Sequence, residues 1–296
     1  MLKRIFTSFI SFILILVAMA TPIDFASSKF QYYDPSLCSL MIHNEGNITF
    51  QVVKISRKDN RIKADYFTSP GQGNTIKEKY DDFKRSHPNI VAYSSAAYMN
   101  IVGLKYAPDG ISIDHGNVVN RDLVIDRLDA LVVVYHNGGI AVNNLATDAV
   151  VTDEGTFKVR SSAYEKDLFI TWAQKNRATV FQTHLLAEKN QLRIRSNSNV
   201  SANRRFLLAS KDKTTGAIYH YIIQNDGSTQ FNLYDGAFEA FQFFKKRGIS
   251  VEWMINLDTG MQDTFGFFTS DGQPHPQIKG DFDMSEARSL LIYYFE

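Results

Sequence analysis

The sequence contains a single cysteine, Cys38, among its 296 residues, so an intramolecular disulfide is excluded and stability must come from an ordinary hydrophobic core. Neither sign of charge is in excess, because 32 basic residues face 31 acidic ones. No cluster of Lys and Arg is interleaved with aromatics, so the sequence gives no indication of a nucleic-acid partner. Beyond the N-terminus, no run approaches the ~20 consecutive apolar residues that a membrane-spanning helix needs.

Several familiar catalytic motifs are also missing. The chain contains no His-x-x-x-His, Cys-x-x-Cys, P-loop or Gly-x-Ser-x-Gly sequence. Zinc-protease, phosphate-cradling NTPase and α/β-hydrolase functions therefore lose their usual support. The seven histidines are scattered, and His184 and His220 fall inside apparent strands, where a core or rim histidine is favoured over a metal ligand. We expect no metal site, and the sequence names no cofactor.

The N-terminus has the layout of a secretory signal peptide. Two basic residues at 3–4 precede an apolar run over 5–17, and small residues follow at 18–20. We expect cleavage after residue 20, which would leave a secreted or periplasmic protein with no stable membrane span. The alternative is an uncleaved N-terminal anchor, because Phe, Ser and Thr dilute the apolar run without excluding an anchor.

The rest of the chain is predicted to be mostly strands with a few helices. Thr75 and Glu78 form a capping-box pattern that begins a helix ending at Ser86. Further helices are expected over 165–176 and 232–247, and hairpin turns are expected at 44–47, at 115–116 and, as a tight two-residue turn, at Asn137-Gly138. The order predicts an α+β fold: one domain with a largely antiparallel or mixed twisted sheet packed by a few helices. We divide the chain into a signal peptide (1–20), an N-terminal extension (21–38) and that domain (39–296).

One carboxylate stands out in this pattern. The apolar strand Val251–Leu257 stops at Asp258, which is followed by Thr259 and Gly260. An unpaired carboxylate at the end of a buried strand is costly unless it is hydrogen-bonded or serves a site. Asp263, five residues later, offers a second carboxylate, although the turn between the two cannot be predicted from sequence.

The last third of the chain carries a resemblance to a known family. "FQTHLLA", an arginine pair opening an apolar strand, "AIYHYIIQNDG", an amphipathic helix ended by Gly248, and "INLDTG" follow in order, with "IVAYSSAAY" and "PDGISIDHGNVVN" upstream. Together they resemble the phosphodiester glycosidase family, the domains similar to N-acetylglucosamine-1-phosphodiester alpha-N-acetylglucosaminidase. The resemblance covers about residues 39 to 268, and each motif is short by itself.

The resemblance implies a set of site residues. In the family, the strand after the amphipathic helix ends in Leu-Asp-Gly-Gly, an early strand ends in Asn-Gly-Gly, and an arginine opens the strand between them. The resemblance implies Asp258 as the catalytic residue. Substrate-binding positions are implied at Ser94, Ser95, Gln182, Thr183, Arg204, Arg205, Thr259 and Gly260, with one of the two arginines facing the site because neighbours on a strand face opposite sides.

This chain departs from the family at its glycines. Thr259 replaces a glycine, and Ser94-Ser95-Ala96 stands where Asn-Gly-Gly would be. Glycine permits positive φ and a close approach of ligand to backbone, whereas a β-branched Thr259 in that conformation would be strained by ~1–3 kcal/mol. Either the loop has another shape here, or the family's chemistry is lost.

These observations leave three functional hypotheses. The first is an exported glycan-processing hydrolase that cleaves a sugar-1-phosphodiester in an envelope or exopolysaccharide component, with a sugar-phosphate or polysaccharide as its ligand. There a carboxylate would activate water and an arginine would bind phosphate. The second is an inactive relative that binds glycan or protein, and the third is a structural envelope protein. In these last two, Asp258 caps a turn and Arg205 pairs with a surface acid.

Overall fold

The computed structural model of the protein describes most of the chain from Asp34 onward. The predicted signal peptide and most of the predicted extension lie outside the described residues. None of the described helices combines the length and apolar character required to cross a membrane. The described ranges are 34–69, 75–102, 105–194, 200–227, 229–260, 262–278 and 283–296.

A seven-stranded sheet is the largest sheet of the fold, and its strand pairings among the described residues are antiparallel. Its hairpin at residues 44–47 is confirmed, with Gly46 in the left-handed region at φ 60°. In spatial order the strands are β1 (Cys38–Glu45), β2 (Ile48–Ser56), β17 (Ile218–Asn225), β16 (Arg205–Lys211), β18 (Val251–Leu257), β14 (Leu185–Glu188) and β15 (Gln191–Leu192).

Two further sheets complete the β framework. The five-stranded sheet consists of β10 (Ile140–Asn144), β9 (Ala130–Val134), β13 (Thr179–Thr183), β7 (Ser112–Asp114) and β8 (Asn117–Asn120). The four-stranded sheet consists of β19 (Phe265–Phe267), β4 (Ile90–Ser94), β20 (Ser289–Phe295) and β3 (Ile62–Thr68). Two small pairs are β5 (Met99–Val102) with β6 (Lys105–Pro108), and β11 (Val150–Val151) with β12 (Thr156–Phe157).

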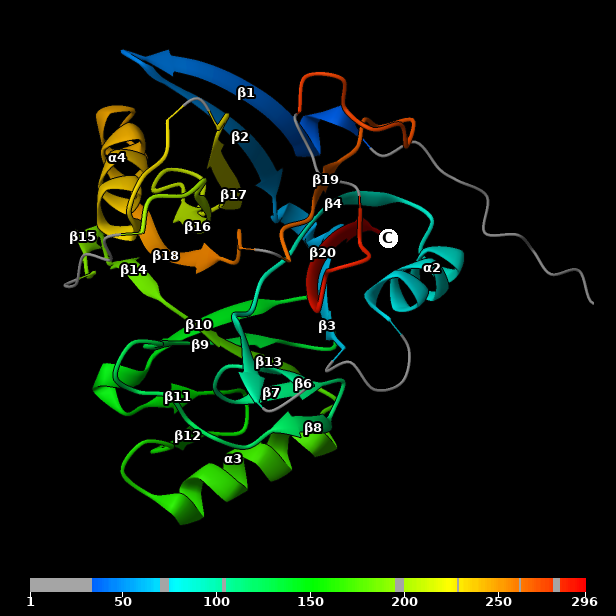
Figure 1. Cartoon of the computed structure of the whole chain (residues 1–296), viewed down its shortest axis with the longest axis vertical. Coiled ribbons are helices and arrows are strands. Elements are labelled where there is room, and N and C mark those ends of the chain that lie inside the picture. Colours follow the sequence, from blue (N-terminus) through cyan, green and yellow to red (C-terminus); the bar gives the residue numbers. More distant parts are fainter. Residues whose placement is uncertain are drawn as a thin grey trace, which may run out of the picture. The chain divides into compact units, whose positions relative to one another are not determined.

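The helices form where their caps predict them. Thr75 accepts the Glu78 backbone N–H while the Glu78 carboxylate accepts that of Thr75, which confirms the capping box. Each of the three described α-helices lies beside a different sheet (Figure 1). The described helices are η1 (Pro35–Leu37), η2 (Lys58–Asn60), α2 (Ile76–Ser86), η3 (Leu145–Thr147), α3 (Ala163–Lys175) and α4 (Leu233–Lys246).

The main core lies where the three sheets face one another. Val53 and Leu207 of the seven-stranded sheet pack in one cluster with Phe181 of the five-stranded sheet and Tyr66 of the four-stranded sheet. The opposite face of the seven-stranded sheet is covered by α4, whose apolar stripe is buried against it. The predicted α+β class is therefore confirmed, with the strands shared among several sheets.

Two local predictions require correction. The tight turn at Asn137-Gly138 is wrong, because β9 and β10 are joined by a five-residue loop in which only Gly138 has a positive φ, 81°. Asn137 instead accepts the Gly139 N–H at 2.9 Å. The segment "ATVFQTHLLA", which the apolar pattern predicts as one strand, is two strands, β13 and β14, which belong to different sheets and meet at His184. Such a crossing places His184 at a seam between sheets.

Candidate functional site

Asp258 directly follows β18 and is tied to the segment that follows β4. The residue is buried, with only 8% of its surface exposed to solvent. Its backbone N–H donates to the Ala96 carbonyl at 3.2 Å, and its own carbonyl accepts the Ser95 hydroxyl at 2.5 Å. The carboxylate Oδ1 accepts the Gly260 backbone N–H at 3.0 Å. These bonds bring the predicted positions Ser95, Asp258 and Gly260 together although they lie far apart in sequence.

An ion pair between the buried Arg205 and the partly exposed Asp263 lies next to this junction. Nη1 of Arg205 is 2.6 Å from Oδ1 of Asp263 and 3.2 Å from the Ser94 hydroxyl. Nε of the same guanidinium donates to Gln224 at 2.9 Å, and its Cζ lies over the Phe265 ring, 4.5 Å from the ring centre. Arg205 is therefore held by protein groups on several sides, as the alternative interpretation of a structural ion pair expects.

The chemical character of Asp258 is set by these surroundings. Burial raises the pKa of its carboxyl above the ordinary value, and the backbone N–H of Gly260 partly offsets that effect. The charge of Asp263 raises the pKa further, while Arg205 lowers it. The balance leaves a carboxylate that is more basic than an exposed aspartate.

A tyrosine lies close enough to Asp258 to feel its charge. The Tyr98 hydroxyl accepts a hydrogen bond from the amide of Asn256, two residues before Asp258. Burial raises the pKa of the phenol, the charge of Asp258 adds to that effect, and the guanidinium groups of Arg204 and Arg127 oppose it. Two arginines and a carboxylate thus act on one phenol. Oδ1 of Asn256 has no hydrogen-bond partner among the described residues.

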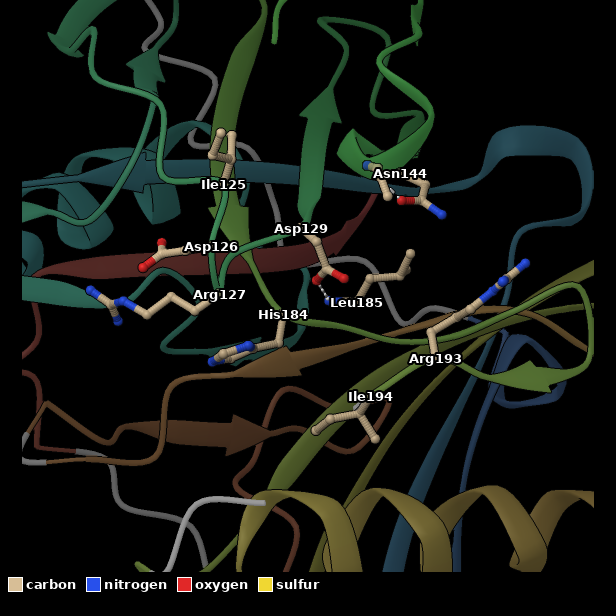
Figure 2. Close-up of a pocket in the computed structure, with 10 residues that line it drawn as sticks. Ile125, Asp126, Arg127, Asp129, Asn144, His184, Leu185, Arg193 and Ile194 are labelled. Carbon is tan, nitrogen blue, oxygen red and sulfur yellow. Dashed lines mark hydrogen bonds between the residues drawn. The ribbon is translucent and has the colours of Figure 1, made fainter. Parts of the chain in front are cut away.

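An open pocket of about 220 Å³ lies at the seam marked by His184. The His184 ring meets Tyr98 edge-on at 5.3 Å between centroids, and burial lowers the pKa of its imidazole to about 4, so the ring is neutral at pH 7. Arg127 and Arg193 extend to opposite sides of this seam pocket, and Asp129 lies between them, accepting the Leu185 N–H at 2.7 Å (Figure 2). The remaining lining residues are Ile125, Asp126, Asn144, Ala146 and Ile194.

Arg204 and Arg205 face opposite ways, as their adjacent positions predict. Arg204 is half-buried, and it donates through Nε to the Phe231 carbonyl at 2.9 Å and through Nη2 to the Val200 carbonyl at 2.7 Å. Arg205 lies with Ser94, whereas Arg204 lies on the Tyr98 side. Both arginines therefore flank the Asp258 loop from different faces of the strand.

The predicted positions Gln182 and Thr183 are fully buried and hold the backbone. The Gln182 amide donates to the carbonyls of Val124 and Leu128 and accepts two backbone N–H groups. The Thr183 hydroxyl donates to the Asn256 carbonyl at 2.7 Å. Their side chains support the walls of the site, and we assign them no direct contact with a ligand.

Thr259 resolves the question raised by the missing glycine. Its backbone does not adopt a positive φ angle, and its hydroxyl donates to the Asn203 carbonyl at 2.7 Å. The loop after Asp258 therefore has a shape that a β-branched residue accepts without strain, and threonine adds a hydrogen bond that glycine could not make.

Replacing Thr259 with glycine is expected to destabilise the protein by ~1–2 kcal/mol. The change removes the bond to Asn203 and increases the conformational entropy of the unfolded chain. Urea unfolding measures the effect, and Thr259→Ser, which retains the hydroxyl, serves as the control and should lose less than half as much. A glycine variant more stable than the parent would contradict the ordinary geometry of this loop.

A second cluster of titratable groups lies away from Asp258. His115 places Nδ1 2.6 Å from Asp114 and Nε2 3.0 Å from Asp65, and Lys79 of α2 lies 2.7 Å from Asp114. Hydrogen bonds to Asp114 and then to Asp65 raise the pKa of His115 to about 10. The cluster connects β3, β7 and α2, and an imidazole bonded to two carboxylates is locked in its charged form.

The His115 cluster predicts a pH-dependent stability. Because the pKa of His115 is raised in the folded state, protonation of this ring stabilises the fold. The contribution is fully present below pH 6.5, the ordinary pKa, and is lost as pH rises through about 10. His115→Asn, which tolerates the φ of 48° at this position, is expected to lower the free energy of unfolding by ~2 kcal/mol at pH 7. The deficit relative to the parent should shrink between pH 7 and pH 10, and a deficit that stays constant across that range would contradict the prediction.

Several residues of the site were not singled out by sequence reasoning. Tyr98 and Asn256 lie inside the motifs "IVAYSSAAY" and "INLDTG" but were given no role, Arg127 lies in no motif, and His184 was expected to be a core or rim residue. Asn256 could have been found from its position, two residues before Asp258 in the same strand. Among the described residues, no group of three His, Cys, Asp or Glu side chains is placed to hold a metal ion.

Comparisons with known proteins give only distant likenesses. No protein-family model matches the sequence, and no curated protein matches it. Among solved structures, the zebrafish N-acetylglucosamine-1-phosphodiester alpha-N-acetylglucosaminidase catalytic domain, auto-inhibited by its pro-peptide, aligns at 13% identity with a TM-score of 0.49, over 88% of this chain and 82% of that one.

Two other solved structures are similarly distant. A hypothetical protein from Synechocystis aligns at 12% identity with a TM-score of 0.47, over 88% of this chain and 62% of that one. A protein from Burkholderia pseudomallei described as exported aligns at 9% identity with a TM-score of 0.42, over 83% and 74% of the two chains. Scores and identities at this level support no statement about activity.

Proposed function

We propose that the chain is an exported glycan-processing hydrolase that cleaves a sugar-1-phosphodiester at the anomeric carbon, with Asp258 as its catalytic carboxylate. The substrate class is a phosphodiester-linked sugar of an envelope or exopolysaccharide component. The observation that carries the proposal is Asp258 itself, a buried strand-end carboxyl with a raised pKa beside a second carboxylate, Asp263. The ordered motifs described in the sequence support the same reaction class.

In the proposed reaction, a water oxygen bonds to the anomeric carbon while the bond from that carbon to the phosphate oxygen breaks. The phosphate monoester departs with the bonding electron pair, so a strong general acid is not required. Asp258 accepts the proton of the water and later releases it to solvent. The raised pKa makes its ionised form a stronger base than an ordinary aspartate.

The surrounding groups take distinct roles in this proposal. Arg205 is already bonded to Asp263 and Ser94, so we assign it the positioning of Asp263 rather than contact with phosphate. Arg204 acts on Tyr98 together with Asp258, and we assign it the phosphate because a guanidinium stays charged and can bind two oxygens. Arg127 joins Tyr98 to the seam pocket, which is the proposed place for the sugar.

A second candidate function is a non-catalytic glycan- or protein-binding module. It is favoured by the burial of two residues that were predicted to contact the substrate, since Ser94 is 1% exposed and Arg205 4% exposed. In this alternative, Asp258 only caps the turn through Gly260, and Arg205 with Asp263 is a structural ion pair. The fold would then retain a binding surface without turnover.

Hydrolysis in isotopically labelled water tests the two functions. Purified mature protein is incubated with a panel of sugar-1-phosphodiesters in H₂¹⁸O, and the products are read by mass spectrometry. The proposal expects a free sugar carrying ¹⁸O and an unlabelled phosphate monoester, because the bond to carbon is the one that breaks. Label in the phosphate would overturn it in favour of phosphodiesterase chemistry, and binding without turnover across the panel would favour the module.

A further inference from the structure

A second pocket of about 420 Å³ lies at the far end of the seven-stranded sheet from Asp258. It is bordered by the end of β16, the turn into β17 and the segment 248–250 that joins α4 to β18. Nothing in the proposed reaction uses it. The side chains that give this far pocket its character are Lys54, Lys211, Asp212, Lys213, Tyr219 and Tyr221.

The far pocket carries a surplus of positive charge. Three lysines line it against one aspartate. The Asp212 carboxylate bonds the backbone of its own turn, where Oδ1 accepts the N–H groups of Thr214 at 2.9 Å and Thr215 at 2.7 Å. Within the described part of the chain, no ion pair includes Lys211 or Lys213, and both are exposed. The ammonium groups are therefore available to an anion that enters the pocket.

Aromatic rings supply the other wall of the far pocket. Nζ of Lys54 lies 4.1 Å above the centre of the Tyr219 ring, and the rings of Tyr219 and Tyr221 are 6.4 Å apart. A tyrosine face offers an apolar surface to the C–H face of a sugar, while its hydroxyl can bond a sugar hydroxyl. Cationic and aromatic groups thus meet in one concavity.

The turn that carries two of the lysines is held in place before any ligand arrives. Besides the two bonds to Asp212 Oδ1, the Asp212 backbone N–H donates to the Ala217 carbonyl at 2.8 Å. Gly216 takes the left-handed φ of 71° that the turn requires. A rigid turn reduces the entropy lost on binding.

The far pocket is separate from the Asp258 site. Arg205 and Lys211 are the two ends of the seven-residue strand β16, and six steps of ~3.3 Å along the strand place them about 20 Å apart. A single sugar unit bound in the far pocket therefore leaves the Asp258 site unoccupied. An extended polymer could occupy both.

We propose that the far pocket binds an anionic saccharide, in which Lys211 and Lys213 contact carboxylate or phosphate groups and the Tyr219 ring packs against the sugar. The site would hold an anionic polysaccharide at the protein surface. It does so whether or not Asp258 is catalytic, because the binding depends on no residue of the proposed reaction.

Titration calorimetry with the full mature protein tests this site. The probes are trigalacturonate, a phosphorylated monosaccharide, neutral maltotriose and inorganic phosphate. Trigalacturonate or the phosphorylated sugar is expected to bind at least about tenfold more tightly than maltotriose and to weaken as salt rises. Which of the two binds better identifies the acid group of the ligand.

The paired variant Lys211→Gln with Lys213→Gln is expected to lose about tenfold in affinity for the anionic saccharide. Tyr219→Leu is expected to lower the affinity for saccharides more than the affinity for inorganic phosphate.

A matched control removes two lysines elsewhere. Lys166→Gln with Lys175→Gln alters the net charge equally on α3, which lies beside the five-stranded sheet, and should leave affinity unchanged. Equal losses in the two paired variants would overturn the proposal in favour of nonspecific charge. Equal affinity for maltotriose and trigalacturonate, binding of inorganic phosphate alone, or tighter binding of a single-stranded oligothymidylate would also overturn it.

Discussion

Asp258→Asn is expected to lower the turnover of a sugar-1-phosphodiester by ~10³-fold, within the range that a general base contributes. Asparagine retains the shape of the side chain and can still accept the Gly260 N–H through its carbonyl oxygen. It removes the charge and the ability to accept a proton. Initial rates at saturating substrate, measured by release of the phosphate monoester, give the effect.

The same variant is expected to fold at least as stably as the parent at neutral pH. The pKa of Asp258 is raised in the folded state, so the folded protein binds the proton more tightly than the unfolded chain. Stability contributed by this group is therefore present at acid pH and is lost as pH rises above its ordinary value of 3.8. Asparagine cannot ionise, so the variant should escape that loss.

Asp283→Asn is the matched control for this experiment. Asp283 accepts the Ser285 backbone N–H at 2.9 Å, the same two-residue turn that Asp258 makes with Gly260, but it is exposed. Its substitution should leave turnover unchanged. If Asp258→Asn also leaves turnover unchanged and costs about 1 kcal/mol of stability, Asp258 is a turn cap and the proposed site is wrong.

Arg205→Met is expected to reduce the free energy of unfolding by about 2–3 kcal/mol, less than the loss of one partner from a fully buried ion pair, because Asp263 is 28% exposed and can be hydrated. The side chain is 5% exposed, and methionine leaves Asp263, Ser94 and Gln224 without their shared partner. Chemical denaturation at pH 7 measures the change. The effect should exceed that of an ordinary surface ion pair because the groups left behind cannot all reach water.

Arg204→Met is the neighbouring control for the ion pair. It removes a half-buried guanidinium with two backbone partners and is expected to cost about 1–2 kcal/mol. A double-mutant cycle of Arg205→Met with Asp263→Asn should give a coupling energy above about 1 kcal/mol. Equal losses at the two arginines, or no coupling to Asp263, would show that Arg205 is not the anchor of this junction.

Local chemistry explains which elements could be predicted from sequence. The capping box at Thr75 satisfies backbone groups within four residues, and the helix of α4 is defined by apolar spacing and ended by Gly248 at φ 69°. The hairpin turn at Asn137 was predicted wrongly because the same two letters fit both a tight turn and a longer loop. The choice was set by residues outside the hairpin, since Gly138 lies against Lys63 and accepts a hydrogen bond from Arg57.

The candidate site likewise has features that the sequence predicts and features that only the tertiary structure decides. By itself, the sequence determined that an apolar strand ends in Asp258, that two adjacent arginines face opposite sides of a strand, and that strands dominate an α+β fold, because these features depend on alternation and on near neighbours. Only the tertiary structure decided that Arg205 forms an ion pair with Asp263, that the backbone of Thr259 has no positive φ angle, and that Tyr98 connects Asp258 with the seam pocket. Those contacts join segments far apart in the chain, and pairing over such separations is set by how the three sheets pack rather than by any short run of residues.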